Sequence, residues 1–78
     1  MAVALGSPLL LLRKQLRVSR EKLARRTNSV STGTIKNAED GKRIICANAD
    51  QIHKAINELL HEAGMQSVVL EDLGIVLY

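Results

Sequence analysis

The apolar residues near the start of the chain recur at intervals of three and four, which is the spacing of one buried helix face. The residues that make this face are Leu9, Leu12 and Leu16. Ser7 before Pro8 is typical of a helix start, because a serine side chain caps free backbone N–H groups and proline suits the first turn. The pattern predicts a helix that begins at Pro8 and ends near Arg17.

Two shorter predicted helices follow, and a serine precedes each of them. Ser19 opens a helix over residues 20–26, and Ser31 opens another over residues 32–39. Residues 27–29, which separate them, have the small polar composition of a turn. The apolar anchors are Leu23 and Ala24 in the first helix, Val30 before the second, and Ile35 and Ala38 within it. This spacing predicts two short helices that pack at a fixed crossing.

Glycines close the predicted elements in the rest of the chain. Gly41 suits the left-handed position that ends the preceding helix, and Gly64 ends a longer helix over residues 47–63. The apolar stripe of the longer helix contains Ala49, Ile52, Ile56, Leu59, Leu60 and Ala63. The tail, residues 65–78, fits either a small hairpin or one helical turn closed by Gly74 and followed by an extended end. We favour the helical turn.

Composition narrows the fold class. The chain has 78 residues, a single aromatic side chain (Tyr78) and neither Phe nor Trp, so its core must be aliphatic. Such a core favours packed helices over a sheet built on aromatic cross-strand pairs. We expect an all-α fold, a compact bundle of four to five helices over residues 7–64, preceded by a flexible apolar arm over residues 1–6. The apolar tail, residues 65–78, is expected to pack on the core or to form a dimer contact.

Basic residues are concentrated in the first part of the chain. Residues 1–43 carry ten Lys and Arg against three Asp and Glu, a net charge of +7, whereas residues 44–78 have a net charge of −4. This asymmetry is typical of a polyanion-binding half joined to a half with another role, and it also fits a solvated basic helix face. Charge alone leaves both interpretations open.

Six anchors in residues 8–63 occur in the order of a known motif. The anchors are Arg13, Ser19, Leu23 with Ala24, Val30 with Ser31, Thr34 with Ile35, and the run Glu39, Asp40 and Gly41. In this order they resemble the phage-repressor and Cro-like helix-turn-helix family, often called the XRE family. The resemblance implies a lambda-repressor-like fold, in which the helix over residues 32–39 enters the major groove of double-stranded DNA.

The resemblance also implies roles for individual residues. Those it places against the bases are Thr32, Gly33, Thr34, Lys36 and Asn37. Those it places against phosphates are Ser19, Arg20, Ser31, Lys42 and Arg43. Arg13 and Glu39 match the structural ion pair of the family, so Glu39 is expected to be structural and not catalytic. Among the base contacts Asn37 is the strongest candidate, because a carboxamide can pair bidentately with adenine.

This chain departs from the family pattern in the region that would contact DNA. Arg20 stands where the family often has glutamine, so attraction to phosphate can replace a side-chain clamp. The turn over residues 27–29 is longer than usual, so the angle between the two helices can differ. Gly33 lies inside a short helix, where glycine costs about 0.5–1 kcal/mol relative to alanine. It either allows close approach of DNA or is tolerated at a fraying helix end.

Other side chains capable of chemistry do not form a recognisable site. Cys46, His53 and His61 lack the spacing of a zinc site, and we expect a buried Cys46 and surface or partly packed histidines. The chain has no phosphate loop and no nucleophile motif, so we expect no enzyme activity, no cofactor and no metal. One cysteine, and no basic residue before the first apolar run, predict a cytoplasmic protein with no signal peptide or membrane contact.

These observations predict a sequence-specific DNA-binding protein that acts as a transcriptional regulator. The simplest form is a homodimeric repressor that occludes a promoter and is associated with the nucleoid when bound. The alternative is a partner-binding module that uses the acidic, apolar C-terminal half. An antitoxin, or a small subunit of a mobile-element or phage-derived complex, would be of this kind.

Overall fold

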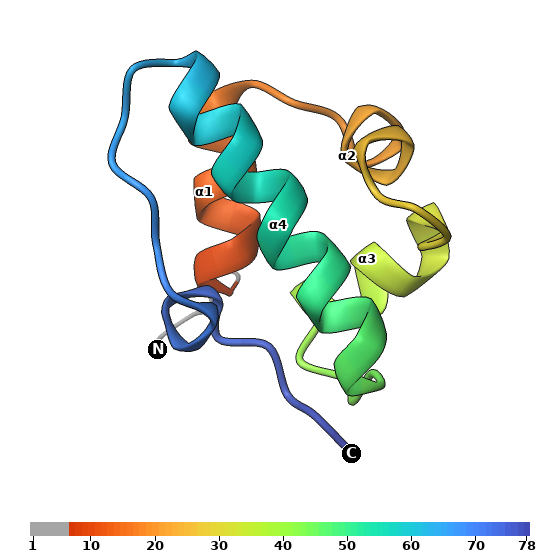
Figure 1. Ribbon diagram of the computed structural model, residues 1–78. Helices are drawn as coiled ribbons and strands as arrows, with labels where there is room; N and C mark the ends of the chain where they lie inside the picture. Colours follow the sequence, from red (N-terminus) through yellow and green to blue (C-terminus); the bar gives the residue numbers. More distant parts are fainter. Residues whose placement is uncertain (1–6) are drawn as a thin grey trace.

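The computed structural model describes residues 7–78, so the expected arm over residues 1–6 lies outside the described residues. Within this range four α-helices and a short 3-10 helix, η1, form a compact bundle (Figure 1). The elements are α1 (Pro8–Leu16), α2 (Arg20–Arg26), α3 (Thr32–Glu39), α4 (Cys46–Glu62) and η1 (Leu70–Leu73). The predicted all-α class is confirmed, and the bounds predicted for α2 and α3 agree with the structure.

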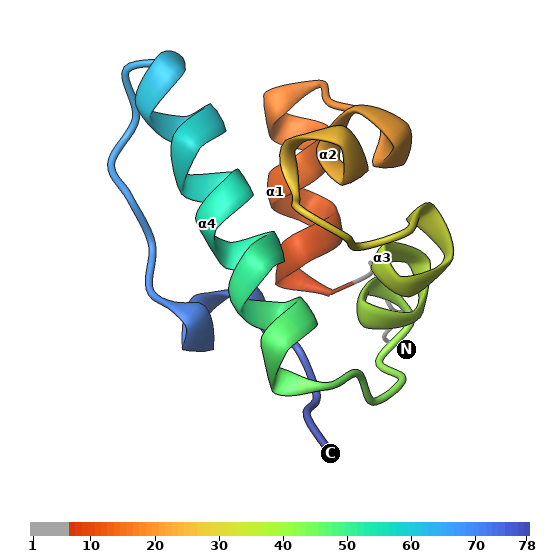
Figure 2. The same cartoon turned by 45° about the vertical axis from the view of Figure 1, so that its right-hand side comes forward.

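The helices enclose one aliphatic core. Helix α4 passes in front of α1, and α2 and α3 lie together at one side of this pair (Figures 1 and 2). Helix α2 contacts both α3 and α4, while α1 contacts α3, α4 and η1. The large side chains that are fully buried are Leu9, Leu23, Ile35, Ile52, Ile56, Leu60 and Leu73. The core therefore joins every helix to the tail.

The three predicted serine caps are present. The Oγ atoms of Ser7, Ser19 and Ser31 each accept a hydrogen bond from the backbone N–H three residues ahead, at 3.2, 3.0 and 3.2 Å. Each bond satisfies a donor that the helix itself leaves without a partner. At its other end α1 stops at Leu16, because Arg17 adopts the left-handed conformation with φ of 59°. Helix α1 is therefore slightly shorter than predicted.

Helix α4 corrects two expectations. Its buried stripe includes Ala55, whereas Ala63 lies beyond the last helical residue and is exposed. Cys46 is also exposed, so the expectation of a buried thiol is wrong. The reason is its position: Cys46 is the first residue of α4, ahead of the stripe that meets the core at Ala49, and its Sγ lies 3.9 Å from Asp50 Oδ2.

The tail forms the predicted helical turn and packs on the core. Helix η1 ends at Gly74, whose φ of 66° is left-handed, and a side chain there would come within 2.7 Å of Pro8 Cδ. After it the chain runs extended, and Ile44 pairs in parallel with Leu77 through bonds of 3.0 Å to Val76 and 3.2 Å from Tyr78. No helix in residues 7–78 has the length and apolarity needed to cross a membrane.

Candidate nucleic-acid interface

Helix α3 divides into a buried face and a polar face. Ile35, Ala38 and Glu39 point into the molecule, and the first two have no exposed surface. The exposed residues on the rest of the helix are Thr32, Gly33, Lys36 and Asn37. At 100° per residue, Gly33 and Asn37 lie opposite the buried face. Four of the five predicted base contacts therefore lie where a large ligand could reach them.

Thr34, the fifth predicted base contact, lies at the edge of this polar face. It is half-buried, and its Oγ1 is 3.2 Å from the Oγ of Ser31. Its backbone N–H also donates to the same Ser31 oxygen at 3.2 Å. The contact between the two hydroxyl groups directs the Thr34 hydroxyl toward the start of its own helix, so it is less available to a base than the side chain of Asn37.

Asp40 adds an acid to the polar face that the sequence analysis did not include. Lys36 Nζ lies 2.8 Å from Asp40 Oδ2. This hydrogen bond holds the pKa of Asp40 below its ordinary value. The spacing of four residues on a helix is a signal that could have predicted the pair. Phosphate or base contacts by Lys36 would compete with Asp40.

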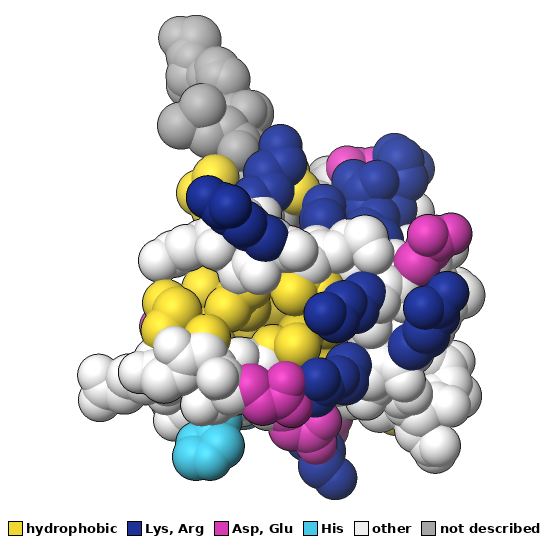
Figure 3. Space-filling view, turned by 90° about the horizontal axis from the view of Figure 1, so that it is seen from above, with side chains coloured by type: hydrophobic (Ala, Val, Ile, Leu, Met, Phe, Trp, Pro, Cys, Tyr) yellow, Lys and Arg dark blue, Asp and Glu magenta, His cyan; other side chains and the backbone are white. Residues whose placement is uncertain are grey.

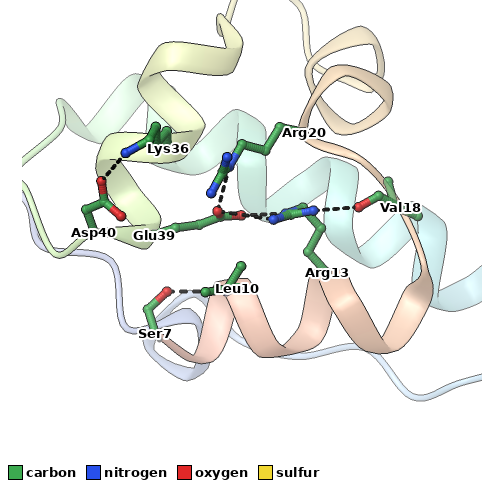
Figure 4. Close-up of polar contacts among 8 residues, drawn as sticks. All are labelled: Ser7, Leu10, Arg13, Val18, Arg20, Lys36, Glu39 and Asp40. Atoms are coloured by element: carbon green, nitrogen blue, oxygen red, sulfur yellow. Dashed lines mark hydrogen bonds and ion pairs between the residues drawn. The ribbon is translucent and has the colours of Figure 1, made fainter. Parts of the chain in front are cut away.

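The buried carboxylate of Glu39 joins three helices (Figure 4). Its side chain has no exposed surface and lies 2.5 Å from Arg13 Nε and 2.8 Å from Arg20 Nε. Arg13 also donates to the backbone oxygen of Val18 at 2.9 Å, which connects α1 to the loop before α2. We call Glu39, Arg13 and Arg20 the Glu39 cluster. It fixes α3 against α1 and α2 from the side opposite the polar face.

Arg20 has a role that sequence reasoning missed. It was expected at a phosphate, yet its Nε donates to Glu39 and only 37% of its side chain is exposed. The interaction spans 19 residues of sequence, so no local spacing could have indicated it. The structural ion pair expected between Arg13 and Glu39 is present, and Arg20 makes it a group of three.

The other predicted phosphate contacts lie at exposed positions. Ser19 and Ser31 are exposed at the starts of α2 and α3, although their hydroxyl oxygens are already used as caps. Lys42 and Arg43 follow α3 directly after Gly41, whose φ of 81° turns the chain away from the helix. Both are exposed. They therefore place two positive charges beside the end of α3.

A second group of ion pairs lies between α2 and α4. Arg26 binds Glu62 through two hydrogen bonds of 2.6 and 2.7 Å, and Glu58 lies 3.9 Å away. We call Arg26, Glu58 and Glu62 the Glu62 cluster. The hydrogen bonds from Arg26 lower the pKa of Glu62 below its ordinary value of 4.5. Arg26 therefore connects α2 to α4 at the surface of the molecule.

Positive charge is not confined to α3. Figure 3 shows the top of the molecule in Figure 1, where Lys and Arg side chains surround a small hydrophobic area on two sides. Exposed basic residues on α1, on α2 and in the loop between them are Lys14, Arg17, Lys22 and Arg25. The basic half of the chain thus carries exposed charge on α1 and α2 as well as on and after α3, and net charge alone does not locate a binding site.

The remaining candidate residues are structural. Half-buried His53 and Asn57 contact the carbonyl oxygen of Val68 at 2.7 and 3.0 Å and so hold the tail, while His61 is exposed. Within residues 7–78 no three His, Cys, Asp or Glu side chains are grouped as a metal site. Comparisons of the chain with protein-family models, curated proteins and solved structures found no match.

Proposed function

We propose that the protein binds double-stranded DNA in a sequence-specific manner by inserting α3 into the major groove. The observation that carries the proposal is the contrast between the two faces of α3. One face is fixed by the buried Glu39 cluster, and the other exposes short polar side chains and Gly33. A helix held rigidly on one side and polar on the other is the geometry that major-groove reading requires.

In this proposal Asn37 reads a base and the flanking cations contact phosphates. The exposed carboxamide of Asn37 lies on the outer face of α3, where it can donate to and accept from adenine. Lys42 and Arg43 lie where the DNA backbone would pass the end of the helix. With about six phosphate contacts, the logarithm of affinity would fall against the logarithm of salt concentration with a slope near −5.

We further propose a homodimeric transcriptional regulator that represses by occluding a promoter. Two copies related by a two-fold axis would read half-sites about 34 Å apart on one face of DNA. The support for a dimer is the group of apolar side chains that stay exposed around the tail and the start of α4: Ile45, Val76, Leu77 and Tyr78. Their exposure on so small a domain is expected of a contact surface.

The experiment that tests the proposal is selection from sheared genomic DNA at two salt concentrations, followed by sequencing of the retained fragments. We expect one short inverted repeat that survives the higher salt. Asn37→Ala should then relax the preference at one base pair per half-site, whereas the matched control Asn28→Ala, in the exposed turn, should leave the preference unchanged. An unchanged preference in Asn37→Ala would rule out the base-reading role.

Gly33 offers a second test of close approach to DNA. The nearest atom to a side chain built there is Ser31 Oγ at 3.8 Å, so the free protein has room for alanine. Gly33→Ala should raise the free energy of unfolding by about 0.5–1 kcal/mol, because alanine loses less backbone entropy in a helix. If DNA lies against this position, the same substitution weakens binding while it stabilises the protein. Equal or tighter binding would show that the groove does not approach Gly33.

A partner-binding module is the second candidate function. The observation that favours it is the same exposed apolar group, which a toxin or another subunit could cover in place of a second copy. In the selection experiment this candidate predicts that no fragment is retained even at the lower salt. Retention of all fragments without preference would instead indicate a basic surface that does not read sequence.

A further inference from the structure

The turn between α2 and α3 is attached to α4 by one side chain. The backbone N–H groups of Asn28 and Ser29 both donate to Oε1 of Gln51, at 2.9 and 2.8 Å. The Nε2 of Gln51 lies 3.3 Å from Ser29 Oγ. A carboxamide oxygen has two lone pairs, so one atom satisfies both N–H groups of the turn. We call these contacts the Gln51 clamp.

Packing does not replace the clamp. Asn28 and Ser29 are exposed, and an open cavity of about 450 Å³ lies between this side of the turn and α4. It is lined by Arg26, Thr27, Asn28, Gln51, Lys54 and Glu58, which are polar or charged. The apolar anchors Leu23 and Val30 hold the two ends of the segment, but no apolar side chain fixes its middle. Hydrogen bonds therefore determine where the middle of the turn lies.

A second set of hydrogen bonds joins only residues close in sequence, from Ala24 to Val30. Thr27 Oγ1 donates to the backbone oxygen of Ala24 at 2.6 Å and accepts from the N–H of Val30 at 3.2 Å. These bonds shape the turn locally, whereas Gln51 lies 22 and 23 residues away in sequence and relates the turn to the rest of the bundle. Because Ser31, the N-cap residue of α3, lies two residues after Ser29, a displacement at Ser29 would move the start of α3.

We propose that Gln51 is a positioning residue for DNA recognition, which sets the direction of α3 through the turn. This inference rests on the proposed function. Gln51 would control the fraction of free molecules in which α3 already has the orientation that major-groove binding requires. Affinity falls in proportion to that fraction. Gln51 itself touches no DNA. Because the turn N–H groups point at Gln51, they also are not donors to phosphate.

The test compares Gln51→Met with Gln51→Glu. Methionine keeps the length and helix propensity of glutamine but cannot accept two strong hydrogen bonds, whereas a carboxylate keeps both acceptors. The readout is the ratio of affinities for the inverted repeat recovered by selection and for an unrelated duplex of the same length. This ratio cancels the uniform effect of the charge that glutamate adds. Amide hydrogen exchange of Asn28 and Ser29 is measured on the same free proteins.

We expect Gln51→Met to lose protection at the two turn amides and to lower the affinity ratio about tenfold, and Gln51→Glu to restore both. A ratio in Gln51→Met equal to that of the unmodified protein would overturn the inference. So would a Gln51→Glu variant as poor as Gln51→Met, or loss of protection throughout the helices, which would indicate a general structural role. If the unmodified protein itself selects no sequence, the proposed function fails first, and that result is distinct from these.

Discussion

The Glu39 cluster and the Glu62 cluster use the same chemical groups in different surroundings. Each pairs a glutamate with arginine on another helix, and each contains hydrogen bonds shorter than 3 Å. The Glu39 side chain is fully buried, whereas 54% of the Glu62 side chain is exposed. Buried charges have lost their water and depend on one another, while exposed charges keep water as an alternative partner. Because of its burial, we expect the Glu39 cluster to contribute more than the Glu62 cluster to holding the helices together.

The largest expected effect is the difference in unfolding free energy between a variant that removes the Glu39 charge and one that removes the Glu62 charge. Glu39→Gln should lower the free energy of unfolding by about 3 kcal/mol, because it leaves the largely buried charge of Arg13 without its counter-charge. The matched substitution Glu62→Gln should lower it far less, because water can replace the partner of an exposed charge. Urea unfolding at neutral pH, followed by circular dichroism, checks both. Equal losses in the two variants would contradict the view that burial distinguishes the clusters.

A smaller difference is expected between the two arginines of the Glu39 cluster. The side chain of Arg13 is 11% exposed and that of Arg20 is 37% exposed. Arg13→Met should lower the free energy of unfolding by about 2–3 kcal/mol, since it also removes the bond to Val18. Arg20→Met should cost about 1 kcal/mol or less, because water screens its charge. The same unfolding measurement ranks them, and the opposite order would show that exposure is a poor guide here.

The smallest effect is a change in titration at the exposed cluster. Arg26 lowers the pKa of Glu62 below 4.5 in the folded protein, so the pair stabilises at neutral pH. This contribution is lost as the pH falls below about 4.5 through the lower folded pKa. Carboxyl NMR should show the pKa of Glu62 rising toward its ordinary value in Arg26→Met. The pKa of Asp40, lowered mainly by Lys36, serves as the internal control and should not move.

Local signals in the sequence predicted the elements that contain them. Ser19 and Ser31 lie directly before α2 and α3, so these starts depend on residues a few positions apart. Gly74 likewise predicted the closing of the turn in the tail. The start of α4 was less well predicted, because Ile45 at its N-terminal boundary offers no capping side chain. The helix begins at Cys46, one residue before the predicted start at residue 47, and Cys46 is exposed.

The candidate site was harder to predict than the helices, because it depends on contacts between residues that are distant in sequence. The pair of Arg13 with Glu39 was predicted only through a family resemblance, because 26 residues separate them. Arg20 and Glu39 are 19 residues apart in sequence, and Gln51 is 22 and 23 residues from the turn amides that it binds. No local sequence pattern predicts contacts over such separations. Exposure also depends on how the helices pack, and for this reason Thr34 is half-buried while its neighbours Gly33 and Lys36 are exposed. These features arise only when the helices have packed.

The burial of Leu73 has a consequence for biosynthesis. This residue has no exposed surface, and Gly74 beside it is closely approached by Pro8, so the start of α1 is covered by a segment made much later. During synthesis α1 emerges from the ribosome before the tail does. Its apolar side chains stay partly uncovered until the residues near 73 have emerged. The domain should therefore gain its full stability only after the residues near 73 have emerged. Nascent chains that stall before that step would present leucines to chaperones and proteases.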